Sequence, residues 1–189
     1  EKSGDVMFRY SSNSFMAWGL TGQGDYAGAI RHWTEARKAA EPLGGRLLLG
    51  EWLTAIESET LLGAGDAIAA LKRGEEALAI AKAAGSVVAE GLAERAIGRA
   101  LAAGSPPRWE EAEAHLAKAV SLLETIGAKF ELARAFLALG QTRIARGDVP
   151  GAATPLERAV ALAGECGLQR EEQLARNLLA GKETDRLRT

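Results

Sequence analysis

The feature that most constrains this fold is a spacing of small residues that occurs four times along the chain. Each copy has an alanine, a second alanine seven residues later and a glycine eight residues after that. The copies are Ala29-Ala36-Gly44, Ala70-Ala77-Gly85, Ala112-Ala119-Gly127 and Ala152-Ala159-Gly167. Their glycines are separated by 41, 42 and 40 residues. Self-similarity at a period of this length indicates stacked structural repeats.

The spacing within each copy predicts a helix. Seven residues are close to two turns, so both alanines lie on one helical face, where small side chains allow two helix axes to approach closely. The glycine suits the left-handed residue that follows a helix end. The pattern predicts four helices, here called the B helices, at about 26–43, 66–84, 108–126 and 149–166. Asp25 suits the N-cap of the first, Pro150 suits the first turn of the last, and Pro155 should kink or delay that helix.

The segments between the B helices predict a second set of helices. These A helices are expected at Val6–Thr21, Arg46–Leu62, Ser86–Ala103 and Lys129–Arg146. A last helix, Gln169–Ala180, has leucines at helical spacing and suits the cap that the end of a repeat array needs. We therefore expect an all-α protein, a right-handed α-solenoid of about four helix-turn-helix repeats with a C-terminal capping helix. The repeats would form one domain over 6–180, with flexible segments at 1–5 and 181–189.

Composition agrees with packed helices and argues against several classes of protein. Hydrophobic residues make up 47% of the 189 residues, but aromatic residues only 5%, which favours helices over sheets. The net charge of −2 argues against direct nucleic-acid binding. No apolar run is long enough to cross a membrane. The single cysteine, Cys166, excludes a disulfide within the chain and suits a cytoplasmic protein.

A search for chemistry finds no catalytic or metal-binding pattern. His32 and His115 lie in different B helices with no carboxylate or cysteine at ligand spacing, so we expect ordinary helix-surface imidazoles. Cys166 lies on the apolar face of its helix and is expected to be a packing residue. The glycines do not form a phosphate-binding or dinucleotide-binding motif. We therefore expect no enzyme activity, metal or cofactor.

A further set of small residues marks where the A and B helices should cross. They lie twelve to fourteen positions before the first alanine of each copy, at Ala17, Ser58, Gly98 and Gly140. With Ile97-Gly98 and Leu139-Gly140 in the place of its Leu-Gly element, the chain resembles the tetratricopeptide repeat over residues 6–180. The period of about 41 exceeds the standard 34 by about seven residues, or two helical turns.

Long repeats of this kind are similar to the helical-repeat regions of large bacterial signalling proteins, such as MalT-like LuxR-type transcription activators and ATPase-linked adenylate/guanylate cyclases. In such proteins, other domains carry out catalysis or DNA binding. The resemblance implies a non-catalytic protein–protein interaction scaffold with a regulatory role. Its partner would be a protein or peptide segment, or another domain of the same full-length protein. A small-molecule effector sensor is the alternative, and RNA binding would require one basic face.

The resemblance also implies that the A helices line a concave binding surface. Four candidates follow the small crossing residues directly, and three lie one or two turns earlier on the same helices. The seven are Trp18, Trp52, Glu59, Arg95, Arg99, Arg134 and Gln141. Aromatic and guanidinium groups are enriched at interface hot spots. Arg95 and Arg99 are one turn apart, so we expect a surface pair that grips an acidic or C-terminal carboxylate of a partner. Solvated positions or intrachain ion pairs remain the alternative.

Overall fold

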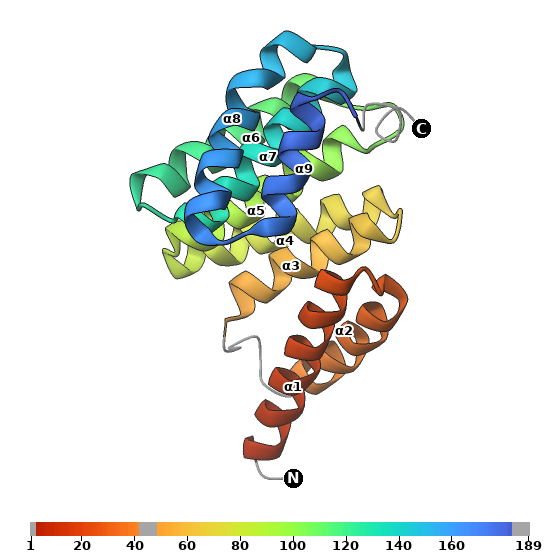
Figure 1. Ribbon diagram of the computed structural model, residues 1–189. Coiled ribbons are helices and arrows are strands. Elements are labelled where there is room, and N and C mark those ends of the chain that lie inside the picture. Colours follow the sequence, from red (N-terminus) through yellow and green to blue (C-terminus); the bar gives the residue numbers. More distant parts are fainter. Residues whose placement is uncertain (1–2, 42–48, 183–189) are drawn as a thin grey trace.

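The computed structural model describes residues 3–41 and 49–182, and this part of the chain is all-α, with no strand (Figure 1). Its helices are α1 (Ser3–Gln23), α2 (Tyr26–Ala40), α3 (Gly50–Gly63), α4 (Ala67–Ala84), α5 (Val87–Ala102), α6 (Trp109–Thr125), α7 (Lys129–Arg146), α8 (Val149–Cys166) and α9 (Gln169–Leu179). The odd helices up to α7 correspond to the predicted A helices and the even helices to the B helices. None of the helices in the described ranges is long and apolar enough to cross a lipid bilayer.

The ends of the helices follow the local chemistry of the sequence. Asp25 is the N-cap of α2, as predicted, and its carboxylate accepts a hydrogen bond from the Gly28 amide at 2.8 Å. Asp66 and Asp148 cap α4 and α8 in the same way. The repeated glycines adopt the left-handed conformation predicted for them, with φ values of 65° at Gly85, 67° at Gly127 and 70° at Gly167. Their equivalent, Gly44, lies outside the described residues.

The helices pack in the order in which they occur in the chain. Each odd helix packs against the even helix that follows it, and successive odd helices contact one another from α1 to α9. Figure 1 shows the helix pairs following one another from the N-terminal pair α1 and α2 to the C-terminal helices α8 and α9. This arrangement places the odd helices next to each other, although they are far apart in sequence.

The predicted small residues lie at the closest contacts between helices. A Cβ atom added at Gly98 would lie 2.8 Å from the Ala112 carbonyl oxygen, and one at Gly140 would lie 2.5 Å from Leu156. Ala77 and Ala119, on the predicted alanine face, are completely buried. Small side chains are therefore required at these contacts because a larger one would overlap the neighbouring helix.

Several predicted boundaries are wrong. Helix α1 begins at Ser3 rather than at the predicted Val6, and residues 1–2 lie outside the described part of the chain. Helix α2 ends at Ala40, and the predicted end of the first B helix at 43 lies outside the described residues. The second A helix begins at Gly50, and its predicted beginning at 46–48 lies outside the described residues. In the predicted tail, residues 181–182 continue from α9 into a turn and residues 183–189 are not described.

The expectation that Pro155 delays the last B helix is also wrong. Helix α8 begins at Val149 and continues through Pro155 to Cys166. A proline within a helix leaves the carbonyl four residues earlier without its usual N–H partner. Here that carbonyl belongs to Gly151, and it accepts a hydrogen bond from Nη1 of Arg143 at 2.9 Å. A side chain of α7 therefore replaces the lost hydrogen bond.

Candidate binding cavity

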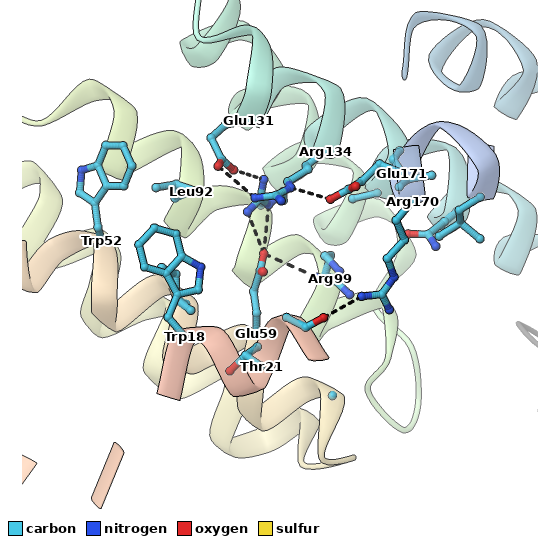
Figure 2. Close-up of a pocket in the computed structure, with 18 of the residues that line it drawn as sticks. Trp18, Thr21, Trp52, Glu59, Leu92, Arg99, Glu131, Arg134, Arg170 and Glu171 are labelled. Atoms are coloured by element: carbon cyan, nitrogen blue, oxygen red, sulfur yellow. Dashed lines mark hydrogen bonds and ion pairs between the residues drawn. The ribbon is translucent and has the colours of Figure 1, made fainter. Parts of the chain in front are cut away.

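A cavity of about 440 Å³ opens between the odd-numbered helices, and we call it the odd-helix cavity (Figure 2). Its walls come from α1, α3, α5, α7 and α9, with Tyr26 of α2 at one edge. All seven sequence-predicted candidates line this one cavity: Trp18, Trp52, Glu59, Arg95, Arg99, Arg134 and Gln141. The structure thus brings together residues from four separate predicted A helices.

Repetition explains why these side chains meet. Trp18, Glu59, Arg99 and Gln141 each follow the small residue at which their helix crosses its partner. Because successive odd helices contact one another, these four positions come together, and all four side chains line the cavity. Helix α9 adds Arg170, Glu171 and Leu174 to the cavity. Sequence reasoning missed these three because it treated α9 as a cap, although α9 follows Gly167 as the earlier A helices follow their glycines.

A chain of alternating charges crosses the cavity. The guanidinium group of Arg95 donates from Nε to Glu59 at 3.0 Å and from Nη1 to Glu131 at 2.5 Å. Arg134 continues the chain, since its Nη1 donates to the other oxygen of Glu131 at 3.3 Å and its Nε to Glu171 at 2.9 Å. Figure 2 shows these contacts joining α3, α5, α7 and α9. Intrachain ion pairs, the alternative left open by the sequence, therefore occupy Arg95 and Arg134.

The expectation that Arg95 and Arg99 form a surface pair is wrong for Arg95. Its side chain is only 5% exposed, because it lies between Glu59 and Glu131 on the neighbouring odd helices. Arg99 does face solvent, with 39% of its side chain exposed, and its Nη1 lies 3.6 Å from Glu59. The two residues differ because the Arg95 guanidinium donates to carboxylates on two neighbouring helices, whereas Arg99 contacts one carboxylate at a longer distance.

Burial and charge act in opposite directions on this network. Burial would raise the pKa of Glu59, but the positive charges of Arg95, Arg99 and Arg134 outweigh it and hold that pKa below its ordinary value. Burial would likewise lower the pKa of Arg95, but the carboxylates of Glu59 and Glu131 outweigh it and raise that pKa. Glu59 and Arg95 therefore both remain charged at neutral pH.

The two ends of the cavity differ in chemistry. In Figure 2, Trp18 and Trp52 lie on one side of the charge network, and Arg99 and Arg170 lie on the other. Trp18 is 41% exposed although it is a large aromatic residue. Arg170 donates from Nη1 to the Gly22 carbonyl at 3.0 Å, so it links α9 to the end of α1. The cavity thus has an aromatic end and a cationic end.

The candidate chemical groups outside the cavity are the two histidines and the cysteine, and each is engaged within the chain. His32 pairs with Asn13 at 2.8 Å and His115 with Glu94 at 2.5 Å, so each imidazole has a partner within the chain. Cys166 is a half-buried thiol that packs against Ala133, Ala163 and Leu168. Within 3–41 and 49–182, no three His, Cys, Asp or Glu side chains gather as they would around a metal ion.

Comparison with known proteins adds no assignment. Neither a scan against protein-family models nor a search of curated proteins found a match for this chain.

Proposed function

We propose that this chain is a right-handed α-solenoid of about four tetratricopeptide-like repeats that acts as a non-catalytic interaction scaffold. In this proposal it is the cytoplasmic regulatory region of a larger bacterial signalling or transcription-regulating protein. The period of about 41 residues, the pairing of each odd helix with the next even helix and the small residues at their contacts support the repeat architecture. The role in regulation rests on the resemblance of the sequence.

The observation that carries the binding function is the odd-helix cavity. Stacked A helices supply a ready-made wall, and the network around Arg95 holds its side chains in place. Rigid presentation lowers the entropy lost on binding. Trp18 and Arg99 remain accessible within it and are of the residue types that dominate interfaces. We propose that a segment of a partner protein, or of another domain of the same protein, inserts an anchor there.

A small-molecule effector is the second candidate, and two observations favour it. The cavity volume of about 440 Å³ falls within the range of roughly 300–1,000 Å³ that is usual for small-molecule sites. In addition, the hydrogen bond from Arg170 to the Gly22 carbonyl joins α9 to α1 through two residues that line the cavity. An effector that binds better when this hydrogen bond is formed, or when it is broken, would shift the relative positions of α1 and α9.

The binding proposal is tested by replacing the aromatic end of the cavity. The partner is first captured from source cells with the wild-type chain, identified and purified, and its affinity for the wild-type chain is measured. The double variant Trp18→Ala/Trp52→Ala should then bind the purified partner much more weakly. Loss of one central aromatic anchor typically weakens binding by about 2 kcal/mol or more, roughly thirtyfold. Phe8→Ala is the matched control, because Phe8 is 73% exposed on α1 and does not line the cavity. Equal binding by all three proteins would reject the cavity as the site.

A further inference from the structure

We propose that the odd-helix cavity selects a ligand group that combines one apolar moiety with one carboxylate, the apolar moiety against Trp18 and Trp52 and the carboxylate against Arg99. This inference deepens the proposed binding function and rests on it. The group could belong to a side chain of a peptide segment or to a free organic acid, and both sources share this chemistry.

The aromatic end of the cavity has the apolar surface that an apolar ligand group would contact. Trp18 and Trp52 lie there together with Ile56 and Leu92, which also line the cavity. Ile56 and Leu92 are buried, at 8% and 3% exposure, so the floor of this end is apolar and packed. Trp18 keeps 41% of its surface exposed, and covering such a surface with an apolar group removes it from water.

The cationic end of the cavity has an excess positive charge and N–H groups that can donate further hydrogen bonds. Among the described residues, the lining contains four arginines, Arg95, Arg99, Arg134 and Arg170, and three carboxylates, Glu59, Glu131 and Glu171. One positive charge is therefore not balanced within the cavity. A group with a single negative charge would neutralise it, whereas a cation would add to it.

Of the two cavity arginines that bond no carboxylate at hydrogen-bond distance, Arg170 donates to the Gly22 carbonyl, whereas Arg99 donates to no described residue and can bind a negatively charged group. Arg95 and Arg134 each donate hydrogen bonds to two carboxylates, whereas Arg99 makes one longer contact, 3.6 Å from Glu59. Within the described ranges, no residue accepts a hydrogen bond from the side chains of Arg99 or Gln141. A planar carboxylate matches the fork of a guanidinium group, and an amide N–H can donate a further hydrogen bond to it.

The carboxylates of the cavity argue against the opposite choice of ligand. Glu59 and Glu131 are both engaged by Arg95, and Glu171 by Arg134. A cationic ligand would have to displace a guanidinium group that already donates in the network. The cavity therefore offers donors to an anion but no unused carboxylate to a cation.

The test uses three blocked probes and the indole N–H signals of the protein in two-dimensional nitrogen–proton NMR spectra. N-acetylphenylalanine carries a phenyl ring and a carboxylate, and N-acetylphenylalaninamide differs only in lacking the charge. The blocked dipeptide N-acetyl-phenylalanyl-aspartyl amide places the carboxylate on a side chain. Trp18 and Trp52 report on the cavity, while Trp33, which is buried and bonded to Thr60, and Trp109 report on the rest of the chain.

At least one of the two acids should shift the Trp18 and Trp52 signals saturably and leave those of Trp33 and Trp109 in place. Its affinity should exceed that of the neutral amide by about tenfold, as expected for a hydrogen-bonded charge. The acid that binds more tightly identifies the source, a side chain of a peptide or a free acid. Equal affinity of acids and amide, shifts confined to Trp33 or Trp109, or no saturable shift with any probe would overturn the inference.

Variants then assign the charge to Arg99. Arg99→Ala should abolish the preference for acid over amide, and Arg158→Ala should keep it, because Arg158 is a 54% exposed arginine on α8 that pairs with Glu124 outside the cavity. If the protein partner depends on Trp18 and Trp52 but all proteins treat acid and amide alike, this inference fails while the proposed binding function stands. If the partner also binds equally well without the two tryptophans, both the proposed binding function and this inference fail.

Discussion

At the scale of single residues, Arg95 is the structural centre of the charge network. Replacement by alanine would leave Glu59 and Glu131 without their buried partner, and breaking a buried pair in this way costs about 3–5 kcal/mol. We expect Arg95→Ala to lower the free energy of unfolding by that amount in urea denaturation. Arg99→Ala should change it by no more than about 1 kcal/mol, because Arg99 is 39% exposed. Equal losses would contradict the different placement of the two arginines.

Glu59 should make stability depend on acidity. Its pKa in the folded protein lies below the ordinary value of 4.5, so the unfolded chain binds its proton first as the pH falls. The stabilisation is present above pH 4.5 and is lost as the pH falls from there through the lowered pKa. We therefore expect the wild-type protein to lose stability more steeply than Glu59→Gln between about pH 5 and pH 3. Parallel urea titrations would check this, and identical slopes would contradict it.

At the scale of helices, the contact between α5 and α6 depends on the absence of a side chain at Gly98. A methyl group there would lie 2.7 Å from Leu116 and 2.8 Å from a backbone oxygen of α6. Gly98→Ala should therefore destabilise the protein by about 1–3 kcal/mol in thermal or urea unfolding.

The control for this substitution is Gly19→Ala in α1, where nothing lies within 4 Å of the added Cβ atom. Alanine is the better helix former, so this variant should gain about 0.5–1 kcal/mol. A destabilised Gly19→Ala or an unaffected Gly98→Ala would mean that the helix contact is placed wrongly.

The link between α7 and α8 supports a second prediction at this scale. Arg143 replaces the hydrogen bond that Pro155 removes from the Gly151 carbonyl, and it also pairs with Glu113. In the variant Pro155→Ala, the backbone N–H of residue 155 can donate a hydrogen bond to the Gly151 carbonyl. The loss of stability caused by Arg143→Ala should therefore be smaller in the Pro155→Ala background, by about 0.5–1.5 kcal/mol. A double-mutant cycle measures this coupling, and strictly additive effects would contradict it.

At the scale of the whole molecule, packing between neighbouring helices predicts that a core substitution destabilises mainly the helices around it. Leu178 of α9 is 3% exposed and packs in a cluster with Leu156 and Ile144. Leu178→Ala should cost about 2–5 kcal/mol. Helix α9 packs against α7 and α8, and its described link to α1 is the exposed hydrogen bond from Arg170 to Gly22, so amide hydrogen exchange should accelerate in α7–α9 while α1 and α2 keep their protection. Equal acceleration at both ends would indicate that the chain unfolds as one cooperative unit.

The features predicted from sequence were those that repeat or depend on a few adjacent residues. Helix type, the Asp25 cap, the left-handed glycines and the small residues at the helix contacts all follow from local geometry and periodicity. Boundaries were less reliable where the signal was weak, as at Ser3 and Gly50. The predicted delay at Pro155 was wrong, and the side chain that replaces the lost hydrogen bond there, Arg143, comes from another helix.

The periodic pattern also allowed all seven candidate residues to be predicted, and all seven line one cavity. Positions at the same place on neighbouring packed helices face the same way. The sequence could not decide which charges meet there. Arg95 lies 36 positions from both Glu59 and Glu131, less than the glycine spacing of about 41, so the ion pairs join positions that are not equivalent between repeats. Their formation depends on how the helices are offset and rotated against each other. For the same reason only the tertiary structure made Arg95 a buried bridge, left Arg99 accessible and brought α9 to the cavity.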